Sequence, residues 1–188
     1  MISEIAGYLS GLLILLSFGP YLKDIFGLKT KPQRASWLIW SILGLISFFS
    51  QWEKGATYSL VMTGAQALGD LLIFILAIRY GVGGLVKRDI MALISAGVSL
   101  ILWYLTKEAA VALMIVIFID AIGAALTVAK TYHQPATETV SSWVLTFAGG
   151  ALAGVAVGRL DYVLLAFPVY ICLASLAVLG AINMGSKK

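Results

Sequence analysis

Seven long apolar segments fill almost the whole of this chain, and they constrain its fold more than any other feature. They lie at about residues 5–26, 35–52, 57–80, 89–106, 109–131, 139–157 and 162–183. A helix needs about 20 apolar residues to cross a bilayer. Only 12% of the residues are charged, whereas a soluble domain averages about 25%. The sequence therefore predicts an all-α integral membrane protein with seven transmembrane helices, because unpaired strands would leave backbone groups unsatisfied in hydrocarbon.

The scarcity of metal-binding residue types excludes several kinds of site. The chain has one cysteine, Cys172, and one histidine, His133. An intramolecular disulfide, a CxxC metal site and an HExxH motif are therefore all excluded. Short loops leave no room for a soluble catalytic or nucleotide-binding domain. We expect no metal, no cofactor and no enzymatic activity.

The basic residues predict the orientation of the helices. Of the 13 lysines and arginines, only Lys54, Lys107 and Arg159 follow an even-numbered segment, and the other ten lie on the opposite side. Lys and Arg collect in cytoplasmic loops, which places the N-terminus outside and the C-terminus in the cytoplasm. The net charge of +4 has the same origin, so nucleic acid is not an expected partner.

The chain contains a weak internal repeat. A shift of 106 residues aligns Ser36-Trp37 with Ser142-Trp143 and Gly44 with Gly150. Segments 1–3 and 5–7 share the same order of long and short spans and of basic and weakly charged loops. We therefore predict a 3+1+3 arrangement of parallel repeats, a plan used by transporters with a solute site between the repeats. The expected units are a first bundle, a linker helix and a second bundle, at residues 1–84, 85–107 and 108–188.

A motif late in the first span connects this layout to a known family. Gly19-Pro20-Tyr21 is followed by Lys29-Thr30 and by Ser36 at the start of the next span. This pattern resembles the PQ-loop superfamily, which includes the SWEET sugar transporters, the cystinosin-type amino-acid exporters and the KDEL receptor. Tyr21 stands where the family motif has Gln, and Leu126-Thr127 stands where the second motif would begin.

The resemblance implies a function and several residue roles. It implies alternating-access transport of a small polar solute, such as a sugar or an amino acid, with the lipid bilayer and the solute as partners. An aspartate in span 5 is implicated in proton coupling in the cystinosin-like branch, which implies that role for Asp120. Pro20 and Pro168 would be gating hinges, and Gln66 and Cys172 occupy the third-helix positions that contact sugar in SWEET-like proteins. A homo-oligomer is compatible with this plan.

Two aspartates also point to a site by their position alone. Asp70 and Asp120 lie near the middle of their spans, where an ionised side chain costs at least about 2.5–3.5 kcal/mol, so such residues by default mark ion or substrate paths. A neutral carboxyl that bonds a neighbouring helix remains the structural alternative. The candidate substrate-binding residues are Thr63, Gln66 and Asp70, which share one helix face, and Trp40, Thr146, Cys172 and Ser175.

Other residues are expected to serve packing or anchoring. Gly150, Gly154 and Gly158 form overlapping GxxxG patterns, which are typical of close helix contacts. Trp37 and Trp143 are expected at the membrane interface, where tryptophan is enriched.

Two other functions remain alternatives. Ala67-Leu68-Gly69-Asp70 nearly matches the GxGD motif of intramembrane aspartyl proteases, with Asp120 as the partner acid. Ala67 replaces the first glycine of that motif, however, and the order of the two acids is reversed. A cargo receptor like the KDEL receptor would need basic residues for a peptide carboxylate, for which Arg79 and Arg159 are the candidates.

Overall fold

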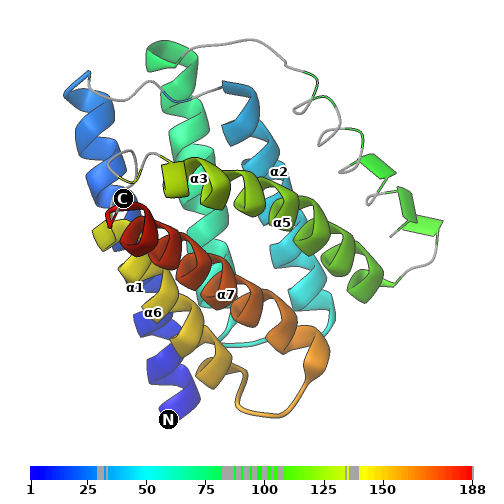
Figure 1. Cartoon of the computed structure of the whole chain (residues 1–188). Helices are drawn as coiled ribbons and strands as arrows, with labels where there is room; N and C mark the ends of the chain where they lie inside the picture. The colour runs from blue at the N-terminus through cyan, green and yellow to red at the C-terminus, as the bar shows by residue number, and fades with distance from the viewer. Residues whose placement is uncertain are drawn as a thin grey trace.

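The computed structural model describes residues 1–28, 32, 34–81, 108–133, 135 and 140–187, together with isolated positions between 87 and 105. For residues 34–36, 109, 122, 123, 126, 129 and 130 it describes the backbone alone. Regular structure within these residues is helical and comprises α1 (Ile2–Phe26), α2 (Arg34–Glu53), α3 (Leu60–Tyr80), α5 (Ala109–His133), α6 (Val140–Val157) and α7 (Tyr162–Gly185) (Figure 1). The predicted fourth span lies largely outside the described residues.

These helices confirm six of the predicted apolar segments, with each boundary within three residues of its expected position. Among the described residues, α1, α3, α6 and α7 are each long and apolar enough to cross a membrane. Pro20 and Pro168 lie inside α1 and α7, and neither proline ends its helix.

The six helices pack in a closed ring. Each packs mainly against two neighbours, in the order α1, α3, α2, α5, α7, α6 and back to α1, and smaller contacts join α3 to α6 and α2 to α7 (Figure 1). The interface between α1 and α6 is the most extensive, and the one between α2 and α5 is the smallest of the six in the ring. A small cluster of buried aliphatic side chains fills the α2–α5 interface, comprising Ile39, Leu43, Ile46, Ala112 and Val116.

The helix ends gather at two opposite ends of the bundle. Contacts at the first end join Gly7 to Tyr58, Gly158 to Ser3, and the Lys54 Nζ to the Glu108 Oε2 at 3.0 Å. Contacts at the second end join Gly81 to Pro32 and Gly185 to Tyr132. Lys54 and Arg159 therefore lie at the first end, whereas Lys23, Arg79 and Lys187 lie at the second. This separation matches the two sides predicted from the basic residues.

Glycines allow the backbones of neighbouring helices to approach closely. A Cβ on Gly7 would overlap the backbone carbonyl of Tyr58, and a Cβ on Gly149 would lie 2.9 Å from the Ile14 side chain on α1. Gly149 thus allows the close contact between α6 and α1. The GxxxG patterns did not include this glycine.

The predicted glycine stripe on α6 is only partly correct. A Cβ on Gly150 would lie 3.0 Å from the Cys172 Sγ, so Gly150 does pack against α7. Gly154 has nothing within 4 Å of such a Cβ, so its predicted packing role is wrong. Gly158 follows the end of α6 with a φ of +70°, which favours glycine, and it also lies against Ser3 of α1.

Asp161 caps the first turn of α7. Its Oδ1 accepts hydrogen bonds from the backbone N–H groups of Val163 and Leu164, both at 3.1 Å. Arg159 donates to its other oxygen at 3.1 Å. The bond from Leu164, aided by the charge of Arg159, holds the pKa of Asp161 below its ordinary value of 3.8.

We expect Asp161→Ala to lower the melting temperature at neutral pH, because it removes a helix cap. The depressed pKa means that the stabilisation by Asp161 is fully present above pH 3.8 and is lost as the pH falls through the lower folded-state pKa. The wild type and Asp161→Ala should therefore melt at converging temperatures in strong acid. Asp161→Asn is the control, since it keeps an acceptor oxygen. Equal melting temperatures at pH 7 would contradict the capping role.

Candidate functional site

Asp70 is buried between α3 and α2. Its side chain is 5% exposed, and the Gln66 Nε2 donates hydrogen bonds to Oδ1 at 3.1 Å and Oδ2 at 3.4 Å. A Cβ on Gly44 of α2 would lie 3.6 Å from the Asp70 Oδ2, so the carboxyl lies directly against that glycine. The spacing that placed Gln66 and Asp70 on one helix face therefore brings them into contact.

Asp120 on α5 has a partner that the sequence analysis missed. The Tyr170 hydroxyl on α7 donates a hydrogen bond to the Asp120 Oδ2 at 2.7 Å. The two residues are 50 positions apart, so no local pattern links them. Both side chains are half-buried. Asp120 is therefore partly exposed as a residue, and its carboxyl has a polar partner on α7.

The two aspartates lie on either side of α2, without a direct hydrogen bond between their described side chains. Asp70 on α3 lies against Gly44 of α2. Ile119, the neighbour of Asp120 on α5, packs against the aliphatic cluster that contains Leu43 of α2. We refer to Asp70 and Asp120 together as the acidic centre.

A second polar group lies toward the first end of the bundle. The Gln51 Nε2 on α2 donates a hydrogen bond to the Thr63 Oγ1 on α3 at 2.9 Å, and both residues are fully buried. Four buried oxygens in this region have no hydrogen-bond partner among the described residues, namely Ser47 Oγ, Ser50 Oγ, Gln51 Oε1 and Ser59 Oγ. Buried polar groups are usually paired, and exceptions call for an explanation such as water or a ligand.

Aromatic side chains lie on the side of Asp70 that is toward the second end of the bundle. Trp37 contacts Tyr21 and Trp40, with ring centroids 5.1 Å and 4.9 Å apart, and it also packs near Phe18. Trp37 is only 9% exposed, so its predicted role as an interfacial anchor is wrong. The helical register turns Trp37 toward α1, where it packs in the core. Trp40 is 37% exposed and keeps accessible ring surface.

The candidates of the second bundle occupy other contacts. Cys172 donates to the backbone carbonyl of Phe147 at 3.6 Å, within the α6–α7 interface. Thr146 donates to the Ser142 carbonyl of its own helix at 2.9 Å. Ser175 is buried and its hydroxyl has no partner. None of these described contacts joins Cys172 or Thr146 to the acidic centre.

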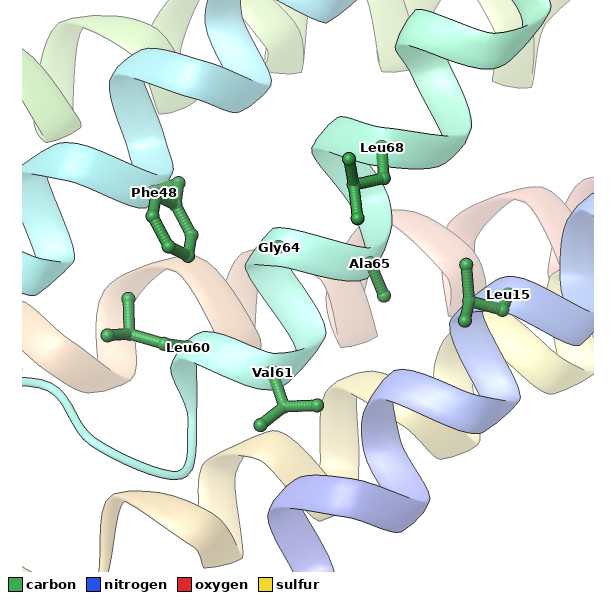
Figure 2. Close-up of a pocket in the computed structure, with 7 residues that line it drawn as sticks. All are labelled: Leu15, Phe48, Leu60, Val61, Gly64, Ala65 and Leu68. Atoms are coloured by element: carbon green, nitrogen blue, oxygen red, sulfur yellow. The ribbon is translucent and has the colours of Figure 1, made fainter.

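The groove shown in Figure 2 lies on the face of α3 opposite Asp70. It is lined by Leu15, Phe48, Leu60, Val61, Gly64, Ala65 and Leu68. Every lining side chain is apolar, so this groove lacks the hydrogen-bonding groups that a polar solute requires. The described residues include no group of three or more histidine, cysteine, aspartate or glutamate residues placed to hold a metal ion.

No protein-family model matches the chain, and comparisons with curated proteins and with solved structures find no similar protein.

Proposed function

We propose that the chain is an integral membrane transporter for a small polar solute, such as a sugar or an amino acid, and that it couples transport to protons. The single observation that carries this proposal is the acidic centre, in which Asp70 of α3 and Asp120 of α5 lie at mid-span on either side of α2. Acids at mid-span are costly in an apolar surrounding and by default mark ion or substrate paths.

The order of helix contacts supports two parallel repeats. Within the proposed first unit the order around the ring is α1, α3, α2, and within the second it is α5, α7, α6. Both units therefore place their third helix between the first and the second. The two main contacts between the units are α2 with α5 and α6 with α1. If each helix is replaced by its counterpart in the other unit, one of these contacts becomes the other. Parallel repeats of this kind carry their solute site at the interface between the units.

The partners of the two carboxyls favour a transporter over the protease alternative. A catalytic aspartyl dyad needs two carboxyls that share a proton. Here Asp70 bonds to Gln66 and Asp120 bonds to Tyr170. We expect the purified wild-type protein to leave helical peptide substrates uncleaved.

Uptake into liposomes tests the transport function. The full chain would be reconstituted and offered labelled sugars, amino acids, amines and vitamins, with and without a pH gradient. We expect at least one solute to accumulate above the level of protein-free liposomes, and to accumulate faster when the gradient is present. Absence of uptake for every class under both conditions would contradict the proposal.

Cysteine labelling tests the orientation. Cysteines introduced at Lys54 or Lys107 should react with an impermeant reagent on intact cells, whereas those at Lys29 or Lys87 should react only after lysis. The native Cys172 would first be replaced by serine. The reverse labelling pattern would overturn the proposed orientation.

Asp70→Asn should weaken binding of the transported solute. Asp70 shares its helix face with Gln66 and Thr63, and a hydrogen bond to a charged group contributes about 1.5–3 kcal/mol, which corresponds to about tenfold or more in affinity. Equilibrium binding to the purified variant measures the change. Asp24→Asn, at the end of α1, is the matched control. Unchanged affinity in Asp70→Asn would remove Asp70 from the solute site.

A further inference from the structure

We propose that the transported solute is an organic cation, held by Asp70 and Asp120 and covered on one side by the ring of Trp40. This inference rests on the proposed transport function and specifies the chemistry of the same site. Three observations carry it: two carboxyls with neutral partners only in the described chain, an aromatic ring one helical turn away, and an unpartnered hydroxyl on the same face of α2.

In the part of the chain that the structure describes, no basic side chain bonds to either carboxyl of the acidic centre. Each of the 13 basic residues of the sequence lies outside the six helices or within three residues of a helix end. The groups that face the two carboxyls in the described chain are neutral, namely the Gln66 amide and the Tyr170 hydroxyl. Buried charges are usually paired or hydrogen-bonded. A bound cation would supply the missing positive charge, whereas an anionic solute would be repelled.

The face of α2 that covers Asp70 also carries an aromatic ring. Gly44 lies against the Asp70 carboxyl, and Trp40 lies one helical turn before Gly44 on the same face. Gly44 has no side chain that would separate the Asp70 carboxyl from Trp40. Trp40 is 37% exposed, so its π-system is available to a ligand. A cation over the face of a tryptophan is attracted by the ring quadrupole, and tryptophan is the best of the aromatic side chains for this contact.

Ser47 provides an independent indication of a ligand. It lies three residues after Gly44, on the side of Asp70 opposite Trp40, and it is fully buried. Its hydroxyl has no hydrogen-bond partner in the described chain. A solute with a cationic group at Asp70 and a hydroxyl or carbonyl a few ångströms away would satisfy it. The site therefore suits an amine or a quaternary ammonium compound that also carries a polar group or an aromatic ring.

Matched pairs of charged and neutral compounds test this inference. The first pair is choline and its neutral isostere 3,3-dimethylbutan-1-ol, and the second is phenethylamine and 2-phenylethanol. Each compound would be tested for thermal stabilisation of the purified full chain and for uptake or competition in proteoliposomes. We expect at least one cation to act at a concentration tenfold or more below that of its neutral partner.

Single substitutions test whether Asp70 and Trp40 bind the cation. Asp70→Asn should weaken the response to the cation by tenfold or more, and Trp40→Leu should weaken it several-fold. Trp52→Leu is the matched control, since Trp52 lies on the same helix, is 60% exposed and is remote from Asp70. Melting temperatures of the unliganded variants separate a loss of binding from a loss of folding.

The outcomes separate this inference from the proposed function. If neither cation binds, if the neutral partner acts equally well, or if Asp70→Asn responds like the wild type, the organic-cation assignment is wrong. Uptake of a neutral or anionic solute that no cation inhibits would likewise overturn it while leaving transport intact. Failure to take up any class of solute would overturn the proposed function itself.

Discussion

Asp120→Asn should abolish pH-driven uptake and leave solute binding and exchange measurable. The asparagine keeps the shape of the side chain, and its amide oxygen can still accept the hydrogen bond from Tyr170, which is 2.7 Å long in the wild type. Folding and expression should therefore be preserved. Asparagine cannot take up or release a proton, so a transport cycle that loads a proton on Asp120 would stop.

The measurement is uptake into liposomes with an imposed pH gradient, compared with exchange between labelled and unlabelled solute at equal pH. Uptake driven by the gradient should fall to the level of protein-free liposomes, while exchange persists. Asp24→Asn controls for the removal of an acid elsewhere in the same protein. Wild-type uptake with an unchanged pH profile in Asp120→Asn would show that Asp120 does not couple protons. The proposed transport function would then rest on the ring architecture and Asp70.

Gly7→Ala should destabilise the protein by about 1–3 kcal/mol, the cost of overpacking a close contact. The new Cβ would overlap the backbone carbonyl and the Cβ of Tyr58. The backbone there cannot rotate away as a flexible side chain would, so α1 would have to move away from the turn that precedes α3. Thermal unfolding in detergent measures the loss.

Gly180→Ala on α7 is the control, because a Cβ at Gly180 would have nothing within 4 Å. Alanine is favoured over glycine in a helix by roughly 0.5–1 kcal/mol, so Gly180→Ala should be neutral or slightly stabilising. Opposite effects of two identical substitutions in helices would establish that close packing at Gly7 is responsible. Equal melting temperatures for the two variants would contradict the packing argument.

The amino-acid sequence alone determined the secondary structure and much of the acidic centre. The length of each apolar segment predicted six described helices to within three residues at each end. Asp70, Gln66 and Thr63 were placed on one face by helical spacing, and the structure brings Gln66 into contact with Asp70. These features depend on residues a few positions apart, so a local pattern is enough to predict them.

Only the tertiary structure decided which faces meet. The sequence did not pair Tyr170 with Asp120, placed Trp37 at a membrane interface where the structure buries it, and assigned packing to Gly154 where Gly149 makes the contact with α1. The physical reason is that these helices are apolar around most of their circumference. A helix of a soluble protein shows its buried face by the contrast between apolar and polar residues. In helices apolar enough to face lipid that contrast is missing, and small residues and shape select the neighbours instead.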